Sequence, residues 1–520
     1  MVLGNPPYER QELFTDLKPY LQAHYAAYHG VADLYVYFYE LGLSLLKGGG
    51  RLGFISSNSF FKTSSGEPLR RLLRNACQLE VLVDFGDWQV FDGVTTYPAV
   101  ITAQKVKPDD ARPARFLQLK GAVPDLSAYF EENKQSLDLS QMSGAAGVAT
   151  GDAAGWQLEG SEASGLRTKL RSGHPALKEA VGSPYRGVLT GLNEAFIVDR
   201  NTRDRLVYAD IASEPLFKPF LEGKDIKRWQ VESEDRWLIL MPKGWTRKGM
   251  QAVGMLAVNE VLAWEWLGAR HAPLAAYLAP FEDAARRRTD QGEFWWELRA
   301  CAYYDKFEQP KIYYPDICVT PSFYLDSQGL YSGNTGYFLP HGQAWLTAFM
   351  NSKAVWFVIM GLSTHIRGGY RRMFTQHIET LPIPASTPEQ QGQLATLAEA
   401  AAQAASERLQ IQRGFARRIH DLLPNPPPKG AQTTLGDNLS QWWLLSDFKA
   451  FQFEVARRFK ADIALRERHE WEQLFNEQRT RIHQLSANVA ALERSIDTVA
   501  YALFGLSAAE IALIERQVLR

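Results

Sequence analysis

The sequence predicts an α/β domain at the N-terminus, then a mixed α+β region and a helical C-terminal region. Three observations lead to this prediction. Helix-like and strand-like segments alternate over residues 1–106, which is typical of a wound α/β sheet with parallel strands. Short strand-like runs rich in aromatic residues fill residues 181–385. Apolar residues recur in steps of three and four near the C-terminus, which indicates helix.

The N-terminal elements follow one another without long gaps. Residues 32–47 place apolar side chains at helical spacing and end at three consecutive glycines, which stop a helix. The later segments are predicted in this order: strand 51–56, basic helix 68–77, strand 79–85 and strand 97–105. Residues 107–180 have weak periodicity and many small residues, so they are predicted to be a linker or insert.

The C-terminal region, residues 386–520, is predicted to be helical. A Gln/Ala-rich helix is expected over 388–423, before a stiff proline-rich linker at 424–428. A heptad seam follows, made of Ile482, Leu485, Val489, Leu492, Ile496, Val499 and Leu503. A helical hairpin that packs on itself is favoured over an intermolecular coiled coil.

Composition excludes several classes of protein. The chain has 520 residues, 46% of them hydrophobic and 22% charged, which is ordinary for a globular protein of two to four domains. No apolar run is long enough for a membrane helix, and no secretory signal is present. Cys77, Cys301 and Cys318 are too few and too scattered for a disulfide framework or a zinc site. We therefore expect a cytoplasmic protein with no metal and no membrane partner.

The net charge alone does not decide whether the chain binds nucleic acid. The total of -1 is not that of a simple nucleic-acid binder, but phosphate binding needs only local positive charge. Three arginine clusters could supply it: Arg70-Arg71 with Arg74, Arg286-Arg287-Arg288, and Arg367 with Arg371-Arg372. The alternative for each cluster is a solvated helix face.

The tetrapeptide Asn5-Pro6-Pro7-Tyr8 follows a strand-like Val2-Leu3-Gly4. Its residue types suit chemistry on the amino group of adenine, whose lone pair is delocalised into the ring. The Asn5 side-chain oxygen and the Pro6 carbonyl can each accept one N–H, and the two prolines hold the turn rigid. Tyr8 offers a flat face to a base that has left the duplex. The alternative is a plain strand-ending turn with an exposed Tyr.

The residues after the tetrapeptide resemble the gamma class of adenine-N6 DNA methyltransferases, in particular TaqI-like and type IIG restriction–modification enzymes. Four motifs stand in the family's order: the tetrapeptide, residues 32–38, residues 45–55 and residues 90–98. The resemblance implies a partial Rossmann-like methyltransferase sheet, with Asn5, Pro6, Pro7 and Tyr8 as catalytic residues. It also implies that Phe91 stacks on the other side of the flipped base, and that Asp33 contacts the cofactor.

Each further motif has a structural alternative. The triple glycine at 48–50 lacks a following Lys-Ser or Lys-Thr, so it is a turn and not a phosphate loop. Asp33 could be only a carboxylate at a helix N-terminus. Phe91 could be a plain core residue.

In this family the glycine-rich loop that holds S-adenosylmethionine precedes the tetrapeptide. No convincing copy of that loop is found in the sequence. We therefore expect an N-terminally truncated or split enzyme that neither binds S-adenosylmethionine nor methylates alone. Its partners would be double-stranded DNA and possibly an upstream methyltransferase fragment.

Residues 181–385 resemble the TaqI-like C-terminal specificity domain. The landmarks are 191–196, 219–226, 310–315, 346–353, 368–372 and 381–384. A recognition domain needs base-edge readers and phosphate anchors. The candidate DNA contacts are Lys224, Arg228, Arg367, Arg371 and Arg372. An internal Lys224–Asp225 ion pair is the alternative for the first. The Trp295-Trp296 and Trp442-Trp443 pairs are expected in the core or an interface.

These predictions give four regions: the C-terminal half of a methyltransferase catalytic domain (1–106), a linker or insert (107–180), a DNA specificity domain (181–385) and a helical region (386–520). The leading function is site-specific adenine-N6 DNA methylation in a restriction–modification or BREX-like phage-defence system. One alternative is a DNA-recognition subunit without catalysis. Another is a methyltransferase acting on a protein release factor or RNA, because the same tetrapeptide serves those substrates.

Overall fold

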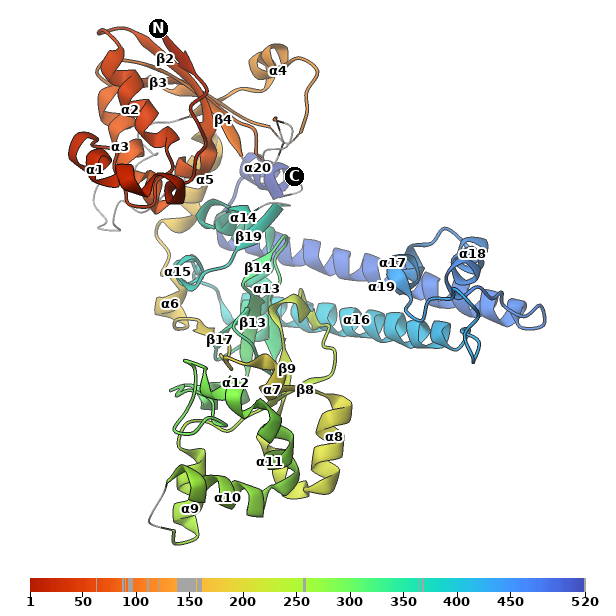
Figure 1. Cartoon of the computed structure of the whole chain (residues 1–520). Helices are drawn as coiled ribbons and strands as arrows, with labels where there is room; N and C mark the ends of the chain where they lie inside the picture. Colours follow the sequence, from red (N-terminus) through yellow and green to blue (C-terminus); the bar gives the residue numbers. More distant parts are fainter. Residues whose placement is uncertain are drawn as a thin grey trace. The chain divides into compact units, whose positions relative to one another are not determined.

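The computed structural model describes residues 1–61, 63–86, 88, 90–91, 97–109, 112–119, 121–137, 156, 161–255, 259–363, 365–366 and 369–518. The chain divides into two compact units (Figure 1). Unit 1 comprises Met1–Ser172 with Thr364–Tyr370, and unit 2 comprises Gly173–Ser363 with Arg371–Arg520.

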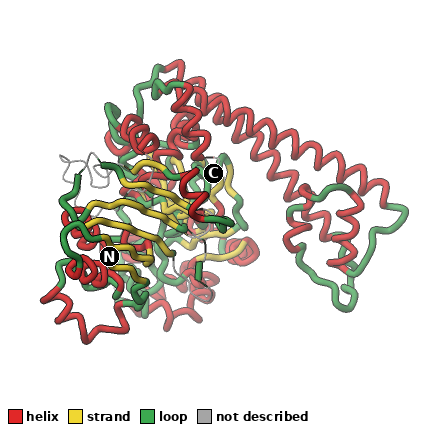
Figure 2. Tube along the Cα trace, turned by 90° about the horizontal axis from the view of Figure 1, so that it is seen from above, coloured by secondary structure: helices red, strands yellow, loops and turns green. Residues whose placement is uncertain are grey.

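Unit 1 is built on a six-stranded sheet in the order β1-β2-β4-β3-β5-β6. Figure 2 shows its strands side by side. The strands are β1 (Val2–Gly4), β2 (Arg51–Ser57), β3 (Gln78–Asp84), β4 (Pro98–Gln104), β5 (Ala114–Gln118) and β6 (Gln135–Leu137). β1 and β2 are parallel, as are β3 and β5, whereas β4 is antiparallel to both of its neighbours.

The expectation of an all-parallel sheet is therefore wrong for β4. A parallel pair needs a crossover connection, usually a helix, to return the chain to the starting edge. The described residues between β3 and β4 contain no helix, so β4 runs back beside β3. The sheet is mixed, and β1, β2, β3 and β5 all point in one direction.

The helices of unit 1 agree with the predicted segments. α2 (Tyr35–Leu45) lies within the predicted 32–47, and α3 (Glu67–Ala76) falls on the predicted basic helix. A Cβ at Gly42 would lie 2.7 Å from a Leu52 methyl carbon, so the absence of a side chain lets α2 pack closely on the sheet. The glycine turn is confirmed, because Gly49 has φ +78°.

Part of the predicted linker or insert contributes to unit 1. β5 and β6 extend the sheet, and α4 (Leu126–Asn133) and α5 (Ser161–Arg171) lie in the same segment. These strands have five and three residues, too short to show a clear period in the sequence. The small-residue run 143–147 lies outside the described residues.

Unit 2 contains two four-stranded sheets, ordered β16-β9-β12-β8 and β15-β13-β17-β7. The first uses β8 (Ile197–Asp199), β9 (Phe217–Leu221), β12 (Arg236–Ile239) and β16 (Tyr331–Ser332). The second uses β7 (Tyr185–Arg186), β13 (Lys311–Pro315), β15 (Tyr324–Asp326) and β17 (Gly336–Pro340). Two short strand pairs lie outside these two sheets: β10 (Ile226–Lys227) with β11 (Gln230–Val231), and β14 (Ile317–Cys318) with β19 (Tyr370–Arg372).

Helices surround these sheets. Five of them occur in the sequence between strands of the two sheets. α8 (Arg200–Ala209) follows β8, and α9 (Trp245–Ala252), α10 (Glu260–Arg270), α11 (Ala272–Leu278) and α12 (Glu282–Arg286) come between β12 and β13. The prediction that Trp295 and Trp296 lie in the core is confirmed, because both are buried in this part of unit 2. α13 (Ala344–Met350) and α14 (Lys353–Leu362) follow and are also largely buried.

Two long helices, α16 (Pro388–His420) and α19 (Arg468–Leu503), pack along each other (Figures 1 and 2). We call them, with residues 421–467 between them, the helical arm. The seam residues Ile482, Leu485 and Val489 are buried within the chain, so the predicted intramolecular packing is confirmed. The connecting segment includes α17 (Gly436–Ser440) and α18 (Phe448–Phe459), and α20 (Ala508–Val518) follows α19.

The predictions of no disulfide framework or metal site and of no membrane helix concern the cysteines, the potential metal ligands and the longest apolar helices. All three cysteines are free, and no group of three or more potential metal ligands occurs among the described residues. In the same part of the chain, no single helix is long and apolar enough to cross a membrane. The bent pair α13–α14 reaches that limit only when both helices are counted together.

Candidate active site and nucleic-acid interface

The carboxyl ends of four strands meet at one edge of the unit 1 sheet, because β1, β2, β3 and β5 run in the same direction. In open α/β sheets this edge is where ligands bind. The Asn5–Tyr8 tetrapeptide leaves the end of β1, and Asn58 and Asp84 stand at the ends of β2 and β3. The topology thus places the predicted catalytic residues at the carboxyl edge of the sheet.

The tetrapeptide alternates between exposed and buried residues. Asn5 and Pro7 are exposed, Pro6 is buried and Tyr8 is partly buried. The fixed φ of the two prolines restricts this turn, which leaves the Asn5 side chain open to solvent. An exposed amide is available as a hydrogen-bond acceptor for an incoming group.

Tyr8 lies beside the N-terminus of α2. Its ring centroid is 6.4 Å from that of Tyr35, at a tilt of 39°. The Tyr8 hydroxyl oxygen is buried and has no hydrogen-bond partner among the described residues. Burial raises the pKa of Tyr8, so the hydroxyl stays protonated at neutral pH.

Asp33 stands just before α2, near the segment that follows the tetrapeptide. The Leu34 N–H donates to the Glu9 carbonyl at 3.0 Å, which ties this segment to the start of the helix. Burial raises the pKa of the half-buried Asp33 carboxyl, and a backbone hydrogen bond from Gln11 partly offsets the shift. Asp33 therefore stabilises the local backbone by accepting the Gln11 N–H. The lone pairs of its carboxylate oxygens that Gln11 does not use can accept a hydrogen bond from another ligand.

Asp84 is a residue of this edge that the sequence reasoning missed. Its carboxylate accepts from Asn58 Nδ2 at 2.8 Å, from the Gly86 N–H at 3.0 Å and from Gln118 Nε2 at 3.3 Å. Gly86 has φ +56°, which favours glycine and turns the chain directly after β3. The buried carboxylate therefore connects three strand ends and holds the start of the loop that carries Phe91.

Phe91 is partly exposed in a bend of that loop. The rest of its motif, residues 92–96, lies outside the described residues. Its stacking on a target base stays a prediction.

The candidate DNA contacts in unit 2 divide into two places. Arg371 and Arg372 lie on β19, which pairs with β14, and Arg228 is near enough to the buried Cys318 of β14 to act on its pKa. Lys224 is exposed in the turn after β9. Arg367 lies outside the described residues.

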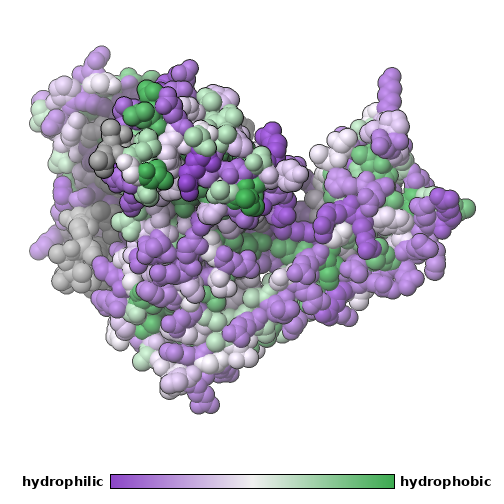
Figure 3. All heavy atoms as spheres, turned by 90° about the horizontal axis from the view of Figure 1, so that it is seen from below, coloured by the Kyte–Doolittle hydropathy of each residue, from purple (hydrophilic) through white to green (hydrophobic). Residues whose placement is uncertain are grey.

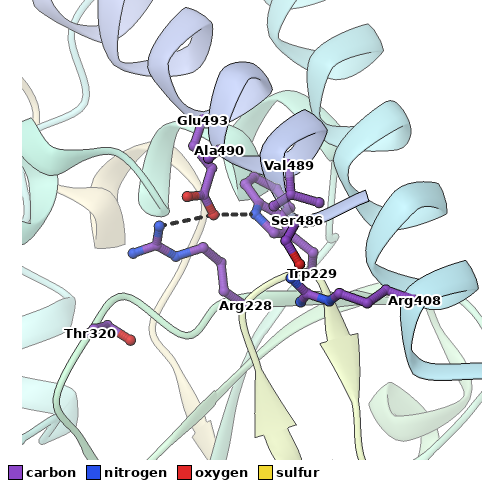
Figure 4. A pocket seen from close by; sticks show the side chains of 8 residues that line it. All are labelled: Arg228, Trp229, Thr320, Arg408, Ser486, Val489, Ala490 and Glu493. Atoms are coloured by element: carbon purple, nitrogen blue, oxygen red, sulfur yellow. Dashed lines mark hydrogen bonds and ion pairs between the residues drawn. The ribbon is translucent and has the colours of Figure 1, made fainter. Parts of the chain in front are cut away.

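Internal partners already bind each described candidate. Arg371 donates to the Met360 carbonyl at 2.8 Å, and Arg372 pairs with Asp316 at 3.0 Å. Arg228 pairs with Glu493 at 3.0 Å in a hollow of about 300 Å³ between the β10–β11 turn and the helical arm (Figure 4).

The suggested Lys224–Asp225 ion pair is not formed. Lys224 pairs instead with Glu222 at 3.1 Å, and the buried Asp225 pairs with Arg236. Neighbouring residues in this tight turn point in different directions, so adjacency in the sequence did not predict the partner.

Two of the clustered arginines are structural. Arg70 is buried and donates to the carbonyls of Phe60 and Thr63 at 2.5 and 2.8 Å. Arg288 is also buried and donates to main-chain carbonyls, including that of Thr190 at 2.5 Å. Burial lowers the pKa of Arg288 to about 10. A guanidinium that is enclosed in this way is not available to a phosphate.

Comparison with protein families divides the chain into three matched segments. Residues 1–91 match the Eco57I restriction-modification methylase, and residues 218–383 match the TaqI-like C-terminal specificity domain. Residues 387–499, which cover most of the helical arm, match a domain of unknown function (DUF8810). By these family matches, the chain resembles a DNA methyltransferase of a restriction-modification system.

Similar curated proteins align with most of this chain. The type II methyltransferase M.XhoI of Xanthomonas vasicola is 28% identical over 74% of this chain and 68% of its own length. M.PaeR7I of Pseudomonas aeruginosa is 27% identical over 75% of this chain and 65% of its own. This chain thus spans about two thirds of the length of these relatives.

A solved structure shows the same fold. The type IIL restriction-modification enzyme MmeI, determined in complex with DNA, aligns with a TM-score of 0.51 and 11% identity. The alignment covers 99% of this chain and 56% of MmeI. At this identity the likeness concerns the fold alone.

Proposed function

We propose that this chain takes part in site-specific adenine-N6 methylation of double-stranded DNA. The observation that carries the proposal is the position of Asn5-Pro6-Pro7-Tyr8 at the carboxyl edge of the sheet, in a segment that matches a restriction-modification methylase. Its setting would be a restriction–modification or phage-defence system.

The residues of the edge suit an extruded adenine. The exposed Asn5 side-chain oxygen and the Pro6 carbonyl would accept the two N–H bonds of the adenine amino group. That would favour a pyramidal nitrogen whose lone pair can attack a methyl sulfonium. Tyr8 and Phe91 would stack on the two faces of the base and offset part of the cost of unstacking it. Asp84 would position the Phe91 loop through Gly86.

The methyl donor in such a reaction is S-adenosylmethionine, which supplies the electrophilic methyl group. Asp33 is this chain's candidate contact to it. The half-buried carboxylate fits only a limited role, because Gln11 already donates a backbone hydrogen bond to it. We therefore assign the target-base side of the reaction to this chain, and retain as a prediction that the chain does not methylate alone.

Unit 2 would select the DNA sequence. Its residues 218–383 match a specificity domain, and Arg228, Arg371 and Arg372 gather near β14. These arginines, with Lys224 and Arg367, would anchor phosphates or read base edges. The same match favours a second candidate function, a DNA-recognition subunit without catalysis.

Methyl transfer to duplex DNA tests the proposal. The chain would be supplied with labelled S-adenosylmethionine, alone and co-expressed with the N-terminal segment of a matched relative, and the digested DNA analysed for N6-methyladenine. We expect product only with the added segment, and a loss of about 100-fold or more in Asn5→Ala, as is typical for removal of a single catalytic hydrogen-bonding group.

The chain contains its own control for this substitution. Asn425-Pro426-Pro427 partly repeats the tetrapeptide, but it lies in the loop after α16 and has no strand before it. Asn425→Ala should leave methyl transfer unchanged. Methylated cytosine as the product, or full activity of Asn5→Ala, would contradict the proposal. DNA binding without transfer in any combination would favour the recognition subunit.

A further inference from the structure

The hollow of about 300 Å³ lies within unit 2, where the β10–β11 turn meets the helical arm (Figure 4). Its lining consists of Arg228, Trp229 and Thr320 from the region of short strands, and of Arg408, Ser486, Val489, Ala490 and Glu493 from α16 and α19. A water molecule takes about 30 Å³ of liquid volume, so the hollow has room for a phosphate group and several waters.

The β10–β11 turn and the arm are attached to each other at this hollow. Glu493 of α19 accepts the Trp229 indole N–H at 2.9 Å and pairs with Arg228 at 3.0 Å (Figure 4). Trp229 is buried and has φ +70°, a strained conformation that persists only where surrounding contacts hold it and that is common at functional sites. Arg413 adds a hydrogen bond to the Ser233 carbonyl at 3.0 Å. The attachment therefore forms the hollow without a ligand.

Arg408 of α16 differs from the other cations of unit 2 discussed above, because no carboxylate among the described residues forms an ion pair with it. The neighbouring Glu407 pairs instead with Arg481 at 2.6 Å. The Arg408 guanidinium donates to Ser486 Oγ at 3.4 Å, which is long for a hydrogen bond. A guanidinium has five N–H donors, so most of those of Arg408 remain available to a ligand.

The charge of the lining fits one backbone phosphate. Two arginines and one glutamate give a net charge of +1 (+2 − 1). The next carboxylate along α19, Asp497, pairs with Lys353 at 3.5 Å and accepts its backbone N–H at 2.8 Å. Each backbone phosphate of DNA carries one negative charge, whereas a phosphate monoester carries about −1.5 to −2 at neutral pH. The lining therefore suits a phosphodiester better than a free phosphate.

We propose that this hollow binds a backbone phosphate of duplex DNA, with Arg408 as its main contact. The planar guanidinium matches two phosphate oxygens at once, and the hydroxyls of Thr320 and Ser486 can donate to the same group. Arg228 stays paired with Glu493 and contributes its positive charge. Figure 3 shows mainly hydrophilic residues on the visible face of the arm, to the right of that view, which suits a polar ligand.

The proposal gives the helical arm a function in DNA binding. Arg408 lies outside the matched specificity domain, residues 218–383, and inside the segment 387–499 that matches a domain of unknown function. The specificity region and the arm would then hold the DNA backbone from two sides of one hollow. The inference rests on the proposed function, because it assumes that unit 2 holds duplex DNA.

The salt dependence of DNA affinity tests the inference. Binding of the full chain to a fluorescent mixed-sequence duplex of about forty base pairs would be measured by anisotropy between about 50 and 200 mM NaCl. Arg408→Gln removes one phosphate contact, so the slope of log K against log salt should become shallower by about 0.9. Over this range the wild-type affinity should fall about 3.5-fold more than that of the variant.

The matched control is Arg417→Gln, which removes an exposed positive charge from the same helix. At 100° per residue, Arg417 lies on the face of α16 opposite to Arg408. This variant should keep the wild-type slope, and circular dichroism should show both variants folded.

Three results would contradict the inference. An unchanged slope in Arg408→Gln, or the same change in Arg417→Gln, would overturn it alone, while no binding by wild type at any salt would refute the proposed function as well. Thermal unfolding in inorganic phosphate and in NaCl of equal ionic strength tests the other source of phosphate. A phosphate-dependent rise in Tm that Arg408→Gln abolishes, together with an unchanged DNA slope, would assign the hollow to free phosphate and overturn the DNA contact.

Discussion

Substitution of Arg288 tests whether this residue of the 286–288 arginine run stabilises the fold or binds DNA. Arg288 is 6% exposed, and its guanidinium donates to four main-chain carbonyls: Ala285 at 3.1 Å, Thr190 at 2.5 Å, Trp295 at 2.5 Å and Glu297 at 3.1 Å. Arg288→Met keeps the apolar length of the side chain but removes every donor. Buried carbonyls that lose their partner cost about 1 kcal/mol or more each, so the variant should lose about 4 kcal/mol of unfolding free energy.

Denaturant unfolding monitored by tryptophan fluorescence is a suitable assay, because Trp295 and Trp296 lie in the same core. Arg287→Met is the matched control, since Arg287 is exposed. It should change unfolding free energy by no more than about 0.5 kcal/mol. The reasoning is refuted if Arg288→Met is as stable as wild type and loses more DNA affinity than Arg287→Met.

Three further predictions concern positions in both units. Asp84→Ala should reduce methyl transfer by about 100-fold, because the loop carrying Phe91 loses its attachment at Gly86; transfer at the wild-type rate would contradict this. Glu493→Ala should cost about 2 to 3 kcal/mol of unfolding free energy, and Glu493→Gln less, because it keeps an acceptor for the indole; equal denaturation curves would argue against the attachment. Burial lowers the pKa of His377 below its ordinary 6.5, so the unfolded chain binds the proton more tightly than the folded chain does. The Tm should therefore fall as pH is lowered from 6.5 through that reduced pKa, and less steeply in His377→Gln.

Local patterns predicted the elements of unit 1 well. The segments 32–47, 68–77 and 97–105 each contain or coincide with an observed helix or strand, because apolar spacing along one segment decides whether it forms helix or strand. The direction of β4 was not predictable in this way. It depends on the connection from β3 and on pairing with β2, which are properties of the assembled sheet.

The candidate site shows the same division. Asn5–Tyr8 is a continuous motif, so the sequence displays it directly. Asp84 is a single carboxylate at the end of a strand, and its partners Asn58 and Gln118 lie 26 and 34 residues away. Only the shared direction of the strands brings these three side chains together. An aspartate at the end of an apolar strand was the one available signal.

The arginine runs mix buried and exposed side chains for a geometric reason. Successive residues of a helix project about 100° apart, so Arg70 is buried while Arg71 is exposed. A count of neighbouring charges treats the two alike. Burial and hydrogen-bond partners distinguish them, and neither is visible without the tertiary structure.

The internal partners of the remaining cations bear on how this protein would bind DNA. Lys224, Arg228 and Arg372 each pair with a carboxylate of the chain. A paired cation that exchanges its carboxylate for a DNA phosphate releases only the counterion condensed on that phosphate. The carboxylate that it leaves becomes an unpaired anion near the DNA. Contacts of this kind suit discrimination between sequences more than affinity.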